Sequence, residues 1–258
     1  MLKIEALLAF EDNYIWCLYD TEHASAWVVD PGDAQVVINF LARHKLKLQG
    51  ILITHHHWDH TQGVAPLKSI MPNIQVIGSR ATQHPSTTHY VQHEDEVELD
   101  GIGVRLKVIA TPGHTLDHIC YYNDQALFCG DTLFSAGCGR IFEGSATQMY
   151  HALMQLSELD DETYVYCTHE YTENNLFFAE QVEPENQDIQ NYKLDVQLRR
   201  SRGLPSLPSQ LKIERAINPF LRCHHTSVQE SVMRHNGLCM QISEKDVFAL
   251  LRTWKDNI

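Results

Sequence analysis

The feature that most constrains the fold is an apolar run that leads directly into a cluster of histidines. Residues 50–54 read Gly-Ile-Leu-Ile-Thr, a pattern typical of a strand buried on both faces, as in the sheets of α/β proteins. The run continues into residues 55–60, His-His-His-Trp-Asp-His. Loops that follow such strands are where α/β proteins present functional side chains. We therefore expect a chemically active loop at the end of a buried strand.

Further apolar runs separated by turns indicate a strand-rich α/β domain over residues 1–172. The runs typical of strands are 14–19, 26–29, 50–54, 75–78, 104–110, 119–122, 126–129 and 164–167. Apolar residues at helical spacing predict helices over 34–44, with Asp33 as N-cap, over 61–69 and over 147–159.

From about residue 172 the pattern changes to one of helices. Those predicted are 174–181, 189–201 and 243–256, with loops around Pro205, Pro208 and Pro219. We therefore expect a second, smaller helical domain over residues 173–258.

The histidine loop offers ligands for two metal ions. His55 and His57 lie two residues apart and can converge on one ion, and Asp59 and His60 can converge on a second. Neutral imidazole and carboxylate are ligands that zinc and similar divalent ions prefer. The alternative is a chance surface cluster of histidines. The position of the loop, between an apolar strand and the Gly63 that precedes a predicted helix, makes that alternative weaker.

Three other donors follow predicted strands in the same way: His114, Asp131 and His169. Each alone would be read as a turn or cap residue, but together with the histidine loop they complete two sites. His55, His57 and His114 would hold one ion, Asp59, His60 and His169 the other, and Asp131 would bridge them. Each ion then keeps an open position, which is typical of catalytic and not of structural sites.

Charge and composition exclude several classes of function. The formal net charge is −13, which disfavours binding to nucleic acid or to an anionic membrane. The first 172 residues carry 22 of the 33 acidic residues but only 9 of the 20 Lys and Arg residues. Together with the 16 histidines, this imbalance indicates bound cations.

The sequence also bears on where the protein works. No run of about 18 apolar residues is present, and Glu5, Glu11 and Asp12 interrupt the beginning of the chain, so we expect neither a membrane span nor a secretory signal. Seven cysteines without a Cys-x-x-Cys pair are read as reduced thiols of a cytoplasmic protein. We expect a monomer.

The ligand set favours hydrolysis. Two divalent ions, two aspartates and a shared hydroxide leave a net charge of about +1, which suits a substrate that develops negative charge on oxygen. Attack of that hydroxide on an electrophilic carbonyl, polarised by one ion, is the expected reaction. Asp59 and Asp131 would be the catalytic carboxylates. A serine or cysteine nucleophile is not required, and neither Gly-x-Ser-x-Gly nor a Cys/His motif is present.

The motifs resemble those of the metallo-β-lactamase superfamily. Residues 54–60, the Thr-Pro-Gly-His-Thr turn at 111–115, the Gly-Asp-Thr-Leu-Phe turn at 130–134 and the Thr-His-Glu-Tyr-Thr segment at 168–172 occur in the order of that superfamily. The segments 137–144, 168–175 and 252–256 resemble bacterial glyoxalase II, the hydroxyacylglutathione hydrolase family.

The resemblance covers essentially the whole length and implies a fold and a reaction. The fold would be a four-layer αββα sandwich followed by a helical domain that binds much of the substrate. The reaction would be hydrolysis of S-D-lactoylglutathione to D-lactate and glutathione, the second step of methylglyoxal detoxification. The ions would be zinc, with iron or manganese as alternatives.

The resemblance also implies substrate-binding residues. Arg252 and Lys255 would hold the glycine carboxylate of glutathione, Arg140 would assist, and Tyr171 would hydrogen-bond the peptide portion. Arg and Lys recognise carboxylates as a fork and as a point charge. From the sequence alone, a solvated helix end is the favoured interpretation of Arg252 and Lys255, and only the resemblance reverses it.

Two positions depart from the family pattern. Asp117 stands where the family usually has glycine, and it could tune metal affinity or carry a cost if the backbone needed a positive φ. Phe142 stands where some relatives have tyrosine, which removes one hydroxyl contact to the ligand. Neither change removes a predicted metal ligand.

Other functions remain open at this point. A lactamase, lactonase or nuclease of the same superfamily would use the same metal motif, and a lactonase is the closest of these. An iron-dependent oxidoreductase acting on glutathione persulfide is a second alternative. A metal-binding module without activity is a third, although open coordination positions argue against it.

Overall fold

The computed structural model describes residues 2–258, and its first sheet has six strands in the order β1 to β6. The strands are β1 (Leu2–Ala9), β2 (Asn13–Asp20), β3 (Ser25–Val29), β4 (Lys47–Leu52), β5 (Gln75–Ser79) and β6 (His89–Val91). The first three pair antiparallel, and β3 to β6 pair parallel. The histidine loop follows β4, which is central in this sheet.

The remaining strands form a second six-stranded sheet, in the order β14-β13-β10-β9-β8-β7, and a small hairpin. The strands of the second sheet are β7 (Glu96–Leu99), β8 (Val104–Ala110), β9 (Ile119–Tyr122), β10 (Ala126–Gly130), β13 (Tyr164–Cys167) and β14 (Ser209–Gln210). The hairpin, which directly follows Asp131, consists of β11 (Leu133–Phe134) and β12 (Gly137–Cys138).

Helices lie between strands in the first part of the chain and dominate after β13. They are α1 (Ala34–His44), α2 (Trp58–Thr61), α3 (Val64–Ile70), α4 (Ala146–Ser157), α5 (Thr172–Val182), α6 (Gln187–Ser201), α7 (Leu211–Ile217), α8 (Thr226–His235) and α9 (Glu244–Asp256). Within residues 2–258, no helix combines the length and the apolar character that crossing a membrane requires.

The chain divides into two compact units. The first unit contains residues 1–110 and 115–130, and the second contains residues 111–114 and 131–258. The domain boundary that the sequence indicates at residues 172 and 173 is a separate expectation, and it stays a prediction.

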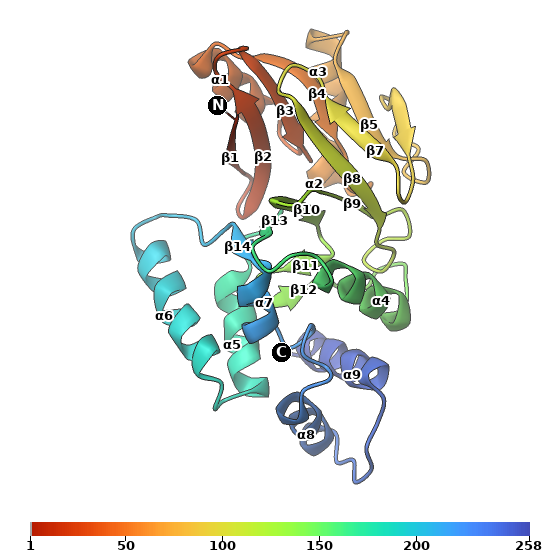
Figure 1. Cartoon of the computed structure of the whole chain (residues 1–258), viewed down its shortest axis with the longest axis vertical. Coiled ribbons are helices and arrows are strands. Elements are labelled where there is room, and N and C mark those ends of the chain that lie inside the picture. The colour runs from red at the N-terminus through yellow and green to blue at the C-terminus, as the bar shows by residue number, and fades with distance from the viewer. Residues whose placement is uncertain (1) are drawn as a thin grey trace. The chain divides into compact units, whose positions relative to one another are not determined.

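The first unit is built on the six-stranded sheet β1–β6. Helices α1 and α3 cover one face of that sheet, where Val37, Leu41 and Leu67 pack against strand residues such as Val28 and Ile51 (Figure 1). On its other side the sheet meets the strands β7–β10. The hydroxyl of Tyr121 in β9 donates to the carbonyl oxygens of Ile53, at 3.0 Å, and Ile77, at 3.2 Å. This buried contact fixes the segment that precedes the histidine loop.

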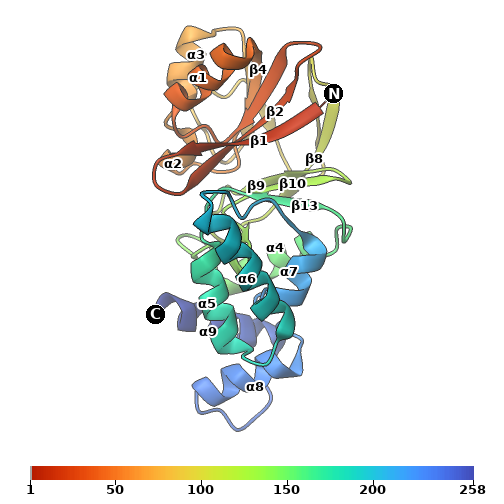
Figure 2. The same cartoon turned by 90° about the vertical axis from the view of Figure 1, so that its left-hand side faces the viewer.

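The second unit is mainly helical. Helix α5 packs beside α6, and α9 packs beside both α4 and α8 (Figure 2). The carboxylate of Glu214 in α7 is fully buried and holds the turn of the β11–β12 hairpin. It accepts from the Ser135 hydroxyl at 2.7 Å and from the Ala136 backbone N–H at 2.8 Å. Ala136 can therefore keep the left-handed backbone conformation, with φ of 56°, that the turn requires.

The observed elements confirm the expected strand-rich α/β region followed by helices, with local differences. Helix α1 begins after Asp33, whose carboxylate caps the N–H groups of Gln35 and Val36 as predicted. The helix predicted over 61–69 is present as α3 but begins at Val64, because the chain turns at residues 62 and 63 after α2. A Cβ on Gly63 would lie 2.3 Å from the carbonyl oxygen of Pro31, so this residue allows a close approach of two backbones.

The cysteines are free thiols, as the sequence indicates. Six of them are buried, namely Cys17, Cys120, Cys129, Cys138, Cys167 and Cys223, and Cys239 is exposed. Burial raises the pKa of the Cys17 thiol to about 12, so this thiol stays protonated at neutral pH.

Candidate metal centre

The loop after β4 is fixed by a buried aspartate at the end of β3. The carboxylate of Asp30 accepts hydrogen bonds from the Thr54 backbone N–H at 2.8 Å and from its hydroxyl at 2.7 Å. It also accepts from Nδ1 of His60 at 2.9 Å. Because Nδ1 carries this proton, Nε2 is the nitrogen of His60 that can bind a metal.

The other candidate ligands of this loop lie close together. Nε2 of His55 lies 3.0 Å from Nδ1 of His57. An oxygen of Asp59 lies 3.5 Å from Nε2 of His60. The same oxygen accepts from the side-chain amide of Asn13 at 3.0 Å, which orients the carboxylate. His55 and His60 are fully buried, so their imidazoles are shielded from water.

Asp131 lies between two histidines of the second unit. One carboxylate oxygen lies 3.4 Å from Nε2 of His114, and the other lies 3.5 Å from Nε2 of His169. Nδ1 of His114 donates to the carbonyl oxygen of Arg140 at 2.7 Å, which leaves Nε2 to face the carboxylate. A carboxylate whose two oxygens face different imidazoles has the geometry of a bridging ligand.

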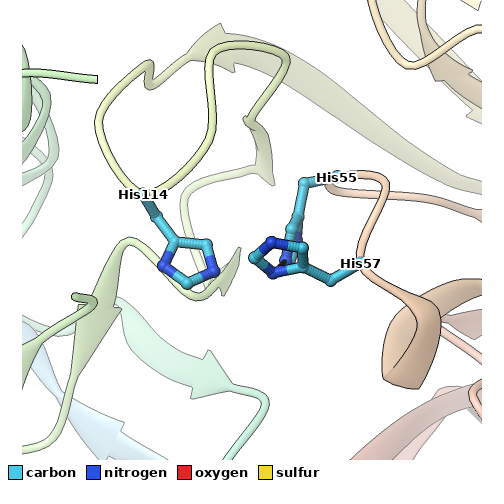
Figure 3. A group of neighbouring side chains, drawn as sticks. All are labelled: His55, His57 and His114. Atoms are coloured by element: carbon cyan, nitrogen blue, oxygen red, sulfur yellow. Dashed lines mark hydrogen bonds between the residues drawn. The ribbon is translucent and has the colours of Figure 1, made fainter. Parts of the chain in front are cut away.

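The structure brings the predicted ligands together in two groups of three. In each group the ligand atoms lie within 4.8 Å of one another: one group is His55, His57 and His114, and the other is Asp59, His60 and His169. Figure 3 shows the imidazoles of the first group turned toward one another. Imidazole nitrogens and carboxylate oxygens in groups of this size suit borderline divalent ions.

The two basic residues expected to bind substrate both lie in α9. Arg252 is buried and donates to the carbonyl oxygen of Cys138 and to Asp256, both at 2.9 Å. The ammonium group of Lys255 donates to the side-chain oxygen of Asn175 in α5. Burial, reinforced by the charge of Arg252, lowers the pKa of Lys255 to about 7.

Arg140 and Tyr171 contact different groups. Arg140 is mostly exposed, and its Nε lies 3.4 Å from the Asp256 oxygen that also accepts from Arg252. The ring of Tyr171 stacks on the imidazole of His169, with centroids 4.7 Å apart and planes 5° apart.

The two positions that depart from the family pattern also have defined surroundings. Asp117 is not among the residues of the described chain with positive φ, so its backbone is not strained there. Burial raises its pKa, but the hydroxyls of Thr115 and Thr82 and the imidazole of His56 outweigh that effect and lower it. Phe142 is exposed and meets the His114 imidazole edge-on, with ring centroids 5.2 Å apart.

Sequence reasoning missed three polar residues that position candidate site residues. Asp30 holds His60, Asn13 holds Asp59, and Asn175 holds Lys255. Asp30 lies in the segment Asp-Pro-Gly-Asp, which indicates a turn, and its φ of 51° agrees with that. Its role in orienting His60 depends on a contact between residues that are 30 positions apart in the sequence, so no local signal reveals that role.

Comparison with known proteins identifies the family. The model of the metallo-beta-lactamase superfamily matches residues 18–169, and the model of the hydroxyacylglutathione hydrolase C-terminus matches residues 170–258. A hydroxyacylglutathione hydrolase of Photobacterium profundum is 46% identical over the full length of both chains, and one of Pseudoalteromonas translucida is 47% identical over the same extent. The chain belongs to the hydroxyacylglutathione hydrolase family.

Solved structures agree on the fold. ETHE1 from Myxococcus xanthus matches 99% of this chain and 98% of its own, with a TM-score of 0.65 and 24% identity. The B3 metallo-beta-lactamase BLEG-1 covers 86% of this chain and 99% of its own, with a TM-score of 0.62 and 23% identity. The expected α/β metallo-β-lactamase fold with a C-terminal helical region is thereby confirmed. Together, the superfamily and the histidine and aspartate groups fit a binuclear metal site.

Proposed function

We propose that this protein is a thioester hydrolase that cleaves S-D-lactoylglutathione to D-lactate and glutathione, the second step of methylglyoxal detoxification. Hydroxyacylglutathione hydrolases similar over the full length support this reaction, and family models for both the catalytic and the C-terminal region match. Related 2-hydroxyacyl thioesters of glutathione are the expected further substrates.

One observation carries the proposal most directly. Helix α5 begins beside a candidate metal ligand and leads to a candidate substrate contact within two turns. Tyr171, at the N-cap of α5, stacks on His169, and Asn175 in the same helix accepts from Lys255. A reacting carbonyl near His169 and a carboxylate near Lys255 would therefore be held by one rigid element.

The proposed metal ligands are those that the sequence indicates. His55, His57 and His114 would hold one ion, Asp59, His60 and His169 the other, and Asp131 both. Zinc is the proposed metal, with iron or manganese as alternatives, because such ligand sets accept all three. When bound, the ions would supply an activated water and polarise the thioester carbonyl.

The charged and aromatic residues of the candidate site would retain the ions and bind the glutathione part of the substrate. Asp59 and Asp131 contribute negative charge that retains the cations. Arg252 and Lys255 would hold the glycine carboxylate, and Arg140 would assist. Arg252 also donates to the carbonyl oxygen of Cys138 in the β11–β12 hairpin and to Asp256. Tyr171 would orient the peptide portion of glutathione.

We also propose the domain bounds, the cellular compartment and the oligomeric state. Residues 1–172 would form the metal-binding domain and residues 173–258 the substrate-binding domain. The protein would act in the cytoplasm as a monomer, with a small thioester as its partner and neither nucleic acid nor a membrane.

The test combines metal analysis with a thioester hydrolysis assay on the purified protein. We expect about two divalent ions per chain and faster turnover of S-D-lactoylglutathione than of a thioester without glutathione. The variant His55→Ala should lose both metal and activity. Two bound ions without hydrolysis of the glutathione thioester, but with cleavage of a lactone or oxidation of glutathione persulfide, would overturn the proposal.

A further inference from the structure

Residues 117–119, which precede and begin β9, contact residues 54–56 at the start of the histidine loop. The backbone N–H of Ile119 donates to the carbonyl oxygen of Thr54 at 2.9 Å. The ring of His118 stacks on that of His55, with centroids 4.8 Å apart and planes 22° apart. Asp117 contacts His56, where its oxygen lies 2.9 Å from Nδ1. The two segments thus run antiparallel, residue against residue.

Asp117 makes the last of these contacts through its side chain. It is only 6% exposed, although the side chain of its partner, His56, is 41% exposed. Because a carboxylate only accepts, Nδ1 of His56 donates, which fixes the imidazole in one orientation. A glycine at position 117 could not make this contact.

His56 lies between His55 and His57, two proposed ligands of one ion, so its backbone conformation affects the position of both. The next residues are fixed from the other side, where the Thr61 hydroxyl donates to the carbonyl oxygens of His57, at 2.9 Å, and His56, at 3.3 Å. Fixing the imidazole of His56 limits the motion of the peptide groups on either side of it. Groups that hydrogen-bond directly to a metal ligand carry effects of about 10- to 100-fold on metal affinity, and an effect passed on through His56 is expected at the lower end of that range.

We propose that Asp117 is a positioning residue that, through Nδ1 of His56, pre-orders the His55–His57 segment for metal binding. The inference rests on the metal-binding role in the proposed function. We therefore expect this protein to bind its metal ions more tightly than a variant with glycine at position 117.

The experiment measures zinc affinity by chelator competition for the full chain and for Asp117→Gly, Asp117→Asn and His56→Ala. Asp117→Gly and His56→Ala should each weaken binding of the first zinc by about 10-fold. Asp117→Asn keeps an acceptor for His56 and should remain within about threefold of the parent. Asp117→Gly also removes the contacts of this carboxylate with Thr115 and Thr82. The double variant Asp117→Gly/His56→Ala should therefore be no weaker than Asp117→Gly alone, because the His56 contact is already lost there.

Two further measurements separate positioning from loss of stability. The visible spectrum of the cobalt-substituted protein should change in Asp117→Gly and not in Asp117→Asn. Asp124→Gly, an exposed position in the turn between β9 and β10, is the matched control for added backbone freedom. It should leave zinc affinity unchanged.

Equal zinc affinity of Asp117→Gly and the parent would overturn the inference. So would an equal loss in Asp117→Asn and Asp117→Gly, because the negative charge and not the hydrogen bond would then act. Failure of the metal-binding role in the proposed function is recognised separately, since His55→Ala would then retain its zinc.

Discussion

Asp131 shows how much a single residue can determine in this protein. Its two oxygens face the imidazoles of His114 and His169, which come from opposite sides of it in the sequence. A neutral amide of the same shape would keep the packing but could supply only one good ligand oxygen and no charge. Replacing Asp131 by this amide therefore separates the effect of its charge on the metal centre from the effect of its packing.

Replacing Asp131 by Asn should lower kcat by about 100-fold or more, since residues that only orient metal ligands already carry effects of 10- to 100-fold. The unfolding temperature of the metal-free protein should change little, because volume and shape are kept. Steady-state kinetics with metal analysis checks this. Full activity with both ions bound would contradict the bridging role.

Lys255 combines a cost to stability with a role in binding. Its pKa is lowered to about 7, so the unfolded chain, with a pKa near 10.5, binds the proton more strongly. The folded state is therefore penalised at neutral pH, and this penalty fades as the pH rises from 7 toward 10.5.

Lys255→Met should raise stability at pH 7 by about 1 kcal/mol, the usual scale of a single substitution. It should raise KM for glutathione thioesters several-fold and leave small thioesters nearly unaffected. Thermal unfolding and kinetics on both substrates test the two effects. A KM that rises equally for both substrates would place Lys255 outside the glutathione site.

The same lysine predicts a pH dependence of substrate binding. Arg252 and Asp256 of α9, Cys138 of β12 and Asn175 of α5 surround its ammonium group. Above pH 7 the free protein loses this charge, so KM for the glutathione thioester should rise by up to about tenfold per pH unit. Lys255→Arg keeps its charge and should show a flatter KM profile over pH 7 to 9. Parallel profiles for the two proteins would exclude Lys255 as the cause.

At the level of elements, the β11–β12 hairpin is supported from several sides. Asp131 precedes the hairpin, the carbonyl oxygen of Cys138 holds Arg252, and the turn is held by Glu214. Desolvation by complete burial raises the pKa of Glu214, and hydrogen bonds from Ser209, Ala136, Ser135 and Asn218 oppose that effect. A helix of seven residues, α7, thus orders a hairpin that lies next to the candidate centre.

Glu214→Ala should destabilise the fold by about 3 kcal/mol, because it leaves the Ser135 hydroxyl and the Ala136 N–H buried without their acceptor. Glu214→Gln keeps one acceptor oxygen and should cost less than half as much. Denaturant unfolding measures both. An unchanged midpoint for Glu214→Ala would show that water replaces the carboxylate.

The sequence predicts those elements whose signals are local. Asp33 and the apolar spacing after it define α1, and alternating or apolar runs define β8, β9 and β13 at their observed bounds. It misses α7 and α8, because Pro205 and Pro208 before α7 and Pro219 between the two helices suggest loops in this part of the chain. It also misses the antiparallel strand β1, because most of its residues are exposed or half-buried and it lacks the apolar run of a buried strand.

For the candidate site, the sequence indicates ligands but not the groups that orient them. His55, His114 and His169 follow apolar strands, a pattern visible along the chain. Asp30 and Asn175 act through contacts between elements that only the folded chain brings together, so their surroundings in sequence carry no trace of the role.

At the level of the whole molecule, the candidate ligands are spread from residue 55 to residue 169. Ions that bind only the folded chain stabilise it by mass action, by about 2.7 kcal/mol when free metal is 100 times its dissociation constant. Removing metal with a chelator should therefore abolish activity and lower the unfolding temperature by several degrees. Calorimetry of the metal-free and reloaded protein measures this, and an unfolding temperature that does not respond to metal would argue against ligands drawn from distant parts of the chain.

The distribution of thiols has a practical consequence. Since Cys239, in the segment between α8 and α9, is the exposed cysteine and the other six are buried, a maleimide dye should attach at one position of the native protein. Labelling would need no cysteine to be removed by mutation. A fluorophore there would report on the segment that precedes the first turn of α9, with the six buried thiols left unmodified.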